Sequence, residues 1–80
     1  MPLEVRFSRS ARKHRIGKAH ALFVMEQTEP RLVPEGESDY ERRLRVGLDD
    51  RGVELEIVAI VLPEVLLVIH VMPASYRRRS

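Results

Sequence analysis

Three histidines are the side chains of this sequence that can exchange protons near neutral pH: His14, His20 and His70. His70 is the polar side chain of an otherwise apolar run at residues 65–72, where it could serve as a general acid or base. The structural alternative is a partly buried histidine that is hydrogen-bonded to the backbone or to a neighbouring glutamate. The sequence alone leaves both interpretations open.

The turn before His70 decides on which face of a sheet its ring lies. If Pro63 and Glu64 form a two-residue turn, antiparallel pairing places His70 opposite Ile57. That face also carries residues 55 and 59, which are apolar, so this pairing favours the structural alternative. A longer loop would change the pairing.

Several common catalytic motifs are absent from the sequence. It has no cysteine, no glycine-rich phosphate loop and no G-x-S-x-G nucleophile elbow. His14 and His20 are six residues apart, which is a poor spacing for two metal ligands on one helix. The sequence therefore predicts neither a metal site nor a cofactor.

Basic residues form a second group with chemical potential. Residues 1–20 carry six basic and one acidic residue, a net charge of +5, whereas residues 26–41 carry six acidic and one basic residue, a net charge of −5. Several arginines on one surface can bind phosphates, although ordinary solvated surfaces are the plainer explanation. The candidates for RNA binding are Arg12, Lys13, Arg15 and Arg77, and Arg42 and Arg45 enter a strand.

The elements that must position these residues follow from hydrophobic periodicity. Residues 3–7 alternate as a short strand does, and Ser8 or Ser10 can cap a helix that Gly17 ends or kinks. A second helix is predicted over residues 18–27, with its inward side chains at Ala19, Leu22, Phe23 and Met25. Residues 28–40, rich in proline and acids, are expected to form an exposed and mobile connection.

Three further strands are predicted at residues 43–48, 53–62 and 65–72, with a tight turn at residues 49–52. The expected fold class is α+β: an N-terminal strand and one or two helices packed on a three- to four-stranded antiparallel meander, with residues 53–62 in the middle. Residues 1–80 form a single domain, which ends in a basic tail at residues 75–80. Strands that are apolar on both sides predict a covering partner, either a second copy or another protein.

Bulk properties indicate a cytoplasmic protein. No apolar stretch approaches the roughly 18 to 20 uninterrupted residues that a membrane span needs. The N-terminal residues also lack the apolar segment of a secretory signal. We therefore expect no membrane partner.

The order of these motifs resembles a known family. Residues 10–16 (Ser-Ala-Arg-Lys-His-Arg-Ile), a following helix, Arg42 five residues before Gly47, a turn and two apolar strands are similar to the BrnT-like toxins of bacterial type II toxin–antitoxin systems, which are relatives of the RelE/ParE toxins. The resemblance spans about residues 3–72. Arg15 stands where the family has glycine, and His70 stands where it has serine.

The resemblance implies metal-independent RNA cleavage, a helix-plus-antiparallel-sheet fold and inhibition by a cognate DNA-binding antitoxin. In such a ribonuclease a base deprotonates a 2′-hydroxyl, arginines stabilise the phosphate and an acid protonates the leaving oxygen. The candidate catalytic residues are His70, Arg42, Arg45 and His14. The alternative is a non-catalytic α+β module that dimerises or binds a partner through its apolar sheet.

Overall fold

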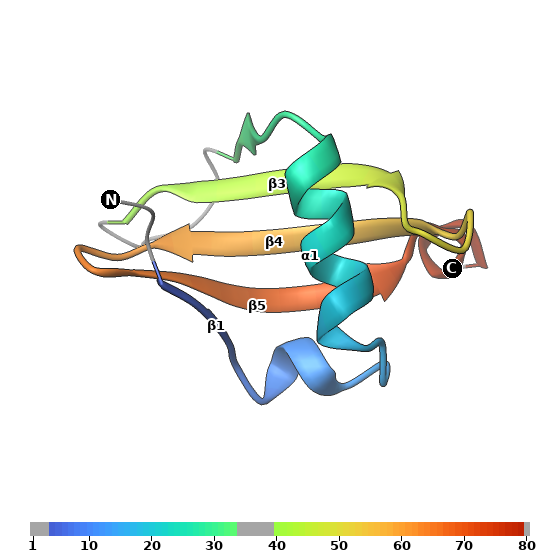
Figure 1. Cartoon of the computed structure of the whole chain (residues 1–80), viewed down its shortest axis with the longest axis horizontal. Coiled ribbons are helices and arrows are strands. Elements are labelled where there is room, and N and C mark those ends of the chain that lie inside the picture. Colours follow the sequence, from blue (N-terminus) through green and yellow to red (C-terminus); the bar gives the residue numbers. More distant parts are fainter. Residues whose placement is uncertain (1–3, 34–39, 80) are drawn as a thin grey trace.

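The computed structural model describes residues 4–33 and 40–79, which form one sheet with one α-helix across it (Figure 1). The sheet has five strands in the order β1-β5-β4-β3-β2. Strand β1 runs parallel to β5, and the other neighbours are antiparallel. The elements in chain order are β1 (Glu4–Phe7), the 3₁₀ turn η1 (Ser10–Arg12), α1 (Lys18–Gln27), β2 (Arg31–Leu32), β3 (Arg42–Leu48), β4 (Glu54–Val61), β5 (Val65–Pro73) and the 3₁₀ turn η2 (Ala74–Arg79).

The α+β class is confirmed, but the expected three- to four-stranded antiparallel sheet is wrong. Strand β1 reaches the far edge of the sheet and pairs in parallel with β5, so that Val5 lies beside Leu66 and Phe7 beside Val68. The two-residue strand β2 forms the opposite edge of the sheet, and it lies in the segment 28–40 that was expected to be irregular. Residues 34–39 of that connection lie outside the described residues.

Helix α1 begins after Gly17 and has the predicted bounds. The Gly17 carbonyl accepts the backbone N–H groups of His20 and Ala21, so Gly17 starts this helix instead of ending an earlier one. The earlier segment is only the 3₁₀ turn η1, where Ser8 Oγ accepts the N–H of Ala11 at 3.2 Å. Because η1 is a short 3₁₀ turn, α1 is the one α-helix within residues 4–33 and 40–79.

The buried side of α1 differs in part from the expected one, although Met25 packs against the core as predicted. Ala21 and Val24 are fully buried, whereas Leu22 and Phe23 are 36% and 37% exposed and Ala19 is exposed. Apolar residues occur all round this helix, so periodicity could not select the inner side. Tertiary contact selects it: a Cβ on Gly47 of β3 would lie 2.5 Å from Thr28 Cγ2, which means that the helix approaches the strand where no side chain intervenes.

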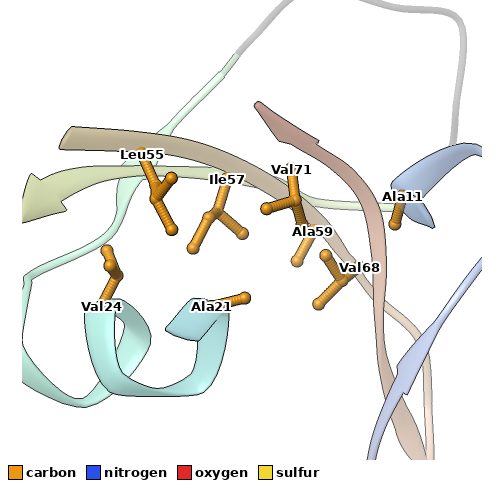
Figure 2. Packing of buried hydrophobic residues seen from close by; sticks show 8 residues of the cluster. All are labelled: Ala11, Ala21, Val24, Leu55, Ile57, Ala59, Val68 and Val71. Atoms are coloured by element: carbon orange, nitrogen blue, oxygen red, sulfur yellow. The ribbon is translucent and has the colours of Figure 1, made fainter. Parts of the chain in front are cut away.

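The core lies between α1 and the sheet (Figure 2). Strand β4 is central, as predicted, and it alternates buried and half-buried side chains through Leu55, Ile57 and Ala59. Val68 and Val71 of β5 and Ala11 of η1 complete this cluster. Every helix within residues 4–33 and 40–79 is too short or too polar to span a lipid bilayer.

The β3–β4 turn forms at residues 49–52, as predicted. Gly52 adopts a φ of 80°, which glycine tolerates without steric cost. The Asp49 carboxylate is buried and accepts the N–H groups of Arg51 and Val53 at 2.8 and 3.0 Å, as well as the Arg51 guanidinium. Burial of Asp49 by itself would raise the pKa, but the bonds from Arg51 and Val53 outweigh it and hold the pKa of Asp49 below its usual value.

A β-bulge in β5 corrects the predicted position of His70. The β4–β5 register shifts between Val58 and Ala59: Ala59 pairs with Val68, but Val58 pairs with His70, which leaves Ile69 as the extra residue. The expected pairing of His70 with Ile57 is therefore wrong. The ring lies on the face of the sheet opposite α1, although the turn at residues 63–64 is as short as supposed, with Leu62 N–H donating to Val65.

Candidate histidine site

Two histidines that are far apart in the sequence meet beside β5. The His14 and His70 rings lie 6.4 Å apart between centroids, at an interplanar angle of 83°. Tyr76 of η2 packs on the other side of His14, with ring centroids 5.3 Å apart. Glu56 of β4 completes the group, because its Oε1 lies 3.6 Å from His70 Nε2. We call these four residues the histidine cluster.

Local structure explains how the cluster forms. The bulge turns His70 onto the face where Glu56 also lies, since Glu56 and Val58 alternate with the core residues of β4. Ser10 Oγ donates to the carbonyl oxygen of Ile69, the bulge residue, at 2.8 Å, and this bond fastens η1 to β5. The attachment brings His14, which follows η1, alongside the strand.

Arg15 has an unusual backbone conformation for a residue other than glycine. Its φ is 55°, in the left-handed region that L residues occupy at a cost and glycine occupies freely. The chain changes direction here between His14 and α1. Arg15 thus forms this turn and places a charged residue next to His14 in the chain.

The predicted catalytic residue Arg45 lies on the opposite face from the cluster. It pairs with Ile57 on the side of α1, and its Nη1 donates to the carbonyl oxygens of Met25 (2.8 Å) and Thr28. These are carbonyls of the last turn of α1, where a cation also complements the helix dipole. Burial, together with the neighbouring Arg43, lowers the pKa of Arg45. Arg45 is thus a helix cap in this structure.

Arg42 lies on the same face as the cluster. It pairs with Ile60, whereas His70 pairs with Val58 across β4, so strand geometry separates the two Cα atoms by about 12 Å. Both side chains are long enough to contact one extended ligand over that span. Arg42 Nε is buried and has no hydrogen-bond partner among the described residues.

Basic side chains flank His14 at the edge of the sheet. Arg12, Lys13 and Arg15 are exposed, and Arg12 Nη2 donates to the carbonyl oxygen of Phe7 at 3.5 Å. The side chain of Arg77, the fourth predicted RNA contact, lies outside the described residues. The structure thus brings His14 and His70 together. Arg12, Lys13 and Arg15 are exposed next to His14 in the chain, Arg42 lies on the face of His70, and Arg45 lies on the other face.

Sequence reasoning allowed a neighbouring glutamate as the partner of His70 but did not name Glu56, and it missed Tyr76. Glu56 carried a signal, since it is the last charged residue before a long apolar stretch of its strand and alternates with core positions. Tyr76 carried none, because its contact depends on how η2 folds back toward His14.

His20 belongs to a separate group at the start of α1. Its Nδ1 lies 2.5 Å from Asp50 Oδ1, and with Asp49 the three ligand atoms lie within 4.8 Å of one another. The Asp49 oxygens already accept bonds from Arg51 and Val53, so a cation would compete with the Arg51 guanidinium. This group holds the β3–β4 turn against α1.

Comparison with known proteins identifies no relative. No family model, no curated protein and no solved structure matches the chain.

Proposed function

We propose that this protein is a metal-independent endoribonuclease, the toxin of a type II toxin–antitoxin system, which a cognate DNA-binding antitoxin neutralises. The observation that supports the proposal most directly is that the His14 and His70 rings lie 6.4 Å apart between centroids, beside the Glu56 carboxylate. Two imidazoles at one site can supply both the base and the acid that phosphodiester cleavage requires near neutral pH.

The reaction needs no group from outside the chain and RNA. His70 accepts the proton of the 2′-hydroxyl, and the 2′ oxygen attacks the adjacent phosphorus. The bond from phosphorus to the 5′ oxygen breaks, and His14 donates a proton to that oxygen. The products are a 2′,3′-cyclic phosphate and a 5′-hydroxyl.

The charged neighbours fit this chemistry. Arg42 extends from the same face of the sheet and is suited to a phosphate oxygen whose charge grows in the transition state. Lys13 and Arg15 are exposed beside His14 and can bind the flanking phosphates of the chain. The motif order that resembles the BrnT-like toxins supports the same assignment and supplies the expectation of an antitoxin.

Growth and RNA cleavage test the proposal together. Expression of the wild type in bacteria should arrest growth, and purified protein should cleave RNA in the presence or absence of ribosomes. His14→Ala and His70→Ala should each lower the cleavage rate by about 10²- to 10⁴-fold, the usual loss for a general acid or base. His20→Ala is the matched control, because it removes the histidine outside the cluster and should retain activity.

Urea unfolding of each variant must accompany these assays, because an unfolded variant also loses activity. A harmless wild type that leaves RNA intact under both conditions would refute the ribonuclease. Equal activity of His70→Ala and His20→Ala, with both variants folded, would refute the assigned site.

A second candidate is a non-catalytic module that dimerises through the sheet face opposite α1. Val46 and Leu48 lie on that face at 38% and 59% exposure, and Leu44 and Ile60 lie beside them in the register. Exposed apolar surface of this kind often marks an interface. Sedimentation across a tenfold concentration range should show self-association, which Leu48→Lys should weaken. A monomer at every concentration would exclude this candidate.

A further inference from the structure

We infer that Glu56 is a positioning residue for His70, which holds the ring so that Nδ1 is the atom that accepts a proton. The inference rests on the proposed function for its catalytic consequence. Its structural content, the orientation and tautomer of His70, can be measured in the protein without RNA.

Burial marks Glu56 as an unusual carboxylate. Its side chain is only 12% exposed, and Met72 lies directly opposite it in the sheet. Taking a carboxylate out of water is costly unless a positive or hydrogen-bonding group faces it. The Oε1 atom of Glu56 faces His70 Nε2 at 3.6 Å.

The two nitrogens of His70 lie in different surroundings. The side chain as a whole is 33% exposed, yet Nε2 is buried and has no hydrogen-bond partner at normal distance. A neutral imidazole carries its proton on one nitrogen and a lone pair on the other. A proton on Nε2 faces the carboxylate favourably, whereas a lone pair there would face negative charge, so the lone pair belongs on Nδ1.

The distance of 3.6 Å is longer than a hydrogen bond and fits a contact that shortens when substrate binds. The Nε2 side of the ring faces the Glu56 carboxylate, which leaves Nδ1 as the nitrogen free to meet a substrate. The His14 ring packs in turn against Tyr76, with 5.3 Å between the ring centroids. Each imidazole of the site therefore has its own supporting side chain.

The experiment compares Glu56→Gln and Glu56→Asp with Glu54→Gln as the matched control. Glu54 lies two residues away on β4 and is exposed. We measure kcat and KM for RNA, and the ¹⁵N resonances of His70, whose values report the tautomer. Urea unfolding reports stability.

Glu56→Gln should lower kcat by about 10- to 100-fold, the loss typical when the side chain that orients a metal-binding histidine is replaced, and KM should change much less. The His70 resonances should change from one tautomer to a mixture. Glu56→Asp should restore part of both, and Glu54→Gln should change neither. If Glu56→Gln does not fold, the ¹⁵N spectrum of Glu56→Asp decides, because a shorter carboxylate should still alter the tautomer ratio.

An unchanged His70 tautomer in folded Glu56→Gln would overturn the inference, whatever the activity. If the wild type cleaves no RNA but the tautomer depends on Glu56, the proposed ribonuclease fails and the positioning role of Glu56 stands. A loss of kcat with an unchanged tautomer would show that Glu56 acts on the substrate directly, which also overturns the inference.

Discussion

Replacement of Gly47 by alanine tests how closely α1 packs on β3. The new Cβ would lie 2.5 Å from Thr28 Cγ2, so the two carbons must separate by 0.9 Å to reach the 3.4 Å of ordinary contact. Thr28 cannot turn away freely, because its Oγ1 donates to the Val24 carbonyl at 2.7 Å and its own carbonyl accepts Arg45. The helix or the strand must therefore move.

The expected cost follows from these contacts. Forcing a methyl group into a packed contact costs about 1–3 kcal/mol. Alanine recovers about 0.5–1 kcal/mol, because it loses less backbone entropy on folding than glycine. We therefore expect Gly47→Ala to lower the free energy of unfolding by about 1–2 kcal/mol. Thr28→Ser, which removes the clashing methyl and keeps the hydroxyl, should cost about 0.8 kcal/mol.

A double-mutant cycle followed by urea denaturation separates the clash from other effects. The Gly47→Ala/Thr28→Ser protein should be more stable than Gly47→Ala, since the atom that clashes is gone. The coupling free energy should be about 1.5–3 kcal/mol, the cost of Gly47→Ala plus the entropy that alanine recovers without the clash. The reasoning is refuted if Gly47→Ala unfolds within about 0.5 kcal/mol of the wild type. It is also refuted if the two substitutions are additive.

Three other substitutions test separate features. Arg45→Met should lower the free energy of unfolding by about 1.5–3 kcal/mol, because two carbonyls at the end of α1 lose a charged donor. Amide exchange should become faster at the end of α1, and Arg43→Met is the control. Arg15→Gly should raise stability by about 0.5–1 kcal/mol, the relief of left-handed strain less the extra entropy of glycine, and a lower urea midpoint would contradict this. Because the pKa of Asp49 is lowered in the folded state, its contribution is present above its unfolded pKa of about 3.9 and is lost as pH falls through the lower folded value. Asp49→Asn should therefore be less stable at neutral pH and should show a flatter loss of stability in acid, and parallel acid curves for the two proteins would count against it.

Local signals in the sequence predicted α1, the turn at residues 49–52 and the central position of β4 correctly. Each depends on neighbours along the chain: an apolar-rich run before Pro30, a glycine at positive φ and an alternating apolar strand. The role predicted for Gly17, the end or kink of an earlier helix, was wrong. The inner side of α1 could not be predicted, because the helix is apolar all round and the space at Gly47 selects the contact.

The error in the position of His70 came from a long-range contact. The bulge that moves His70 is held by Ser10, which bonds the Ile69 carbonyl from another part of the chain. Strand alternation without that bulge placed His70 on the wrong face. An arginine on a strand suits a phosphate contact, and the sequence does not show that the last carbonyls of α1 lie within reach of Arg45, which caps the helix.

The parallel pairing of β1 with β5 constrains when the protein can become functional during synthesis. Glu4 pairs with Val65, so the first described strand has no partner in the sheet until 61 more residues have been translated. At about 5–20 residues per second, the ribosome takes about 3–12 s to make them. His14 depends on the same late strand for its contact with His70. A nascent chain therefore carries no histidine cluster before β5 and η2 have been translated.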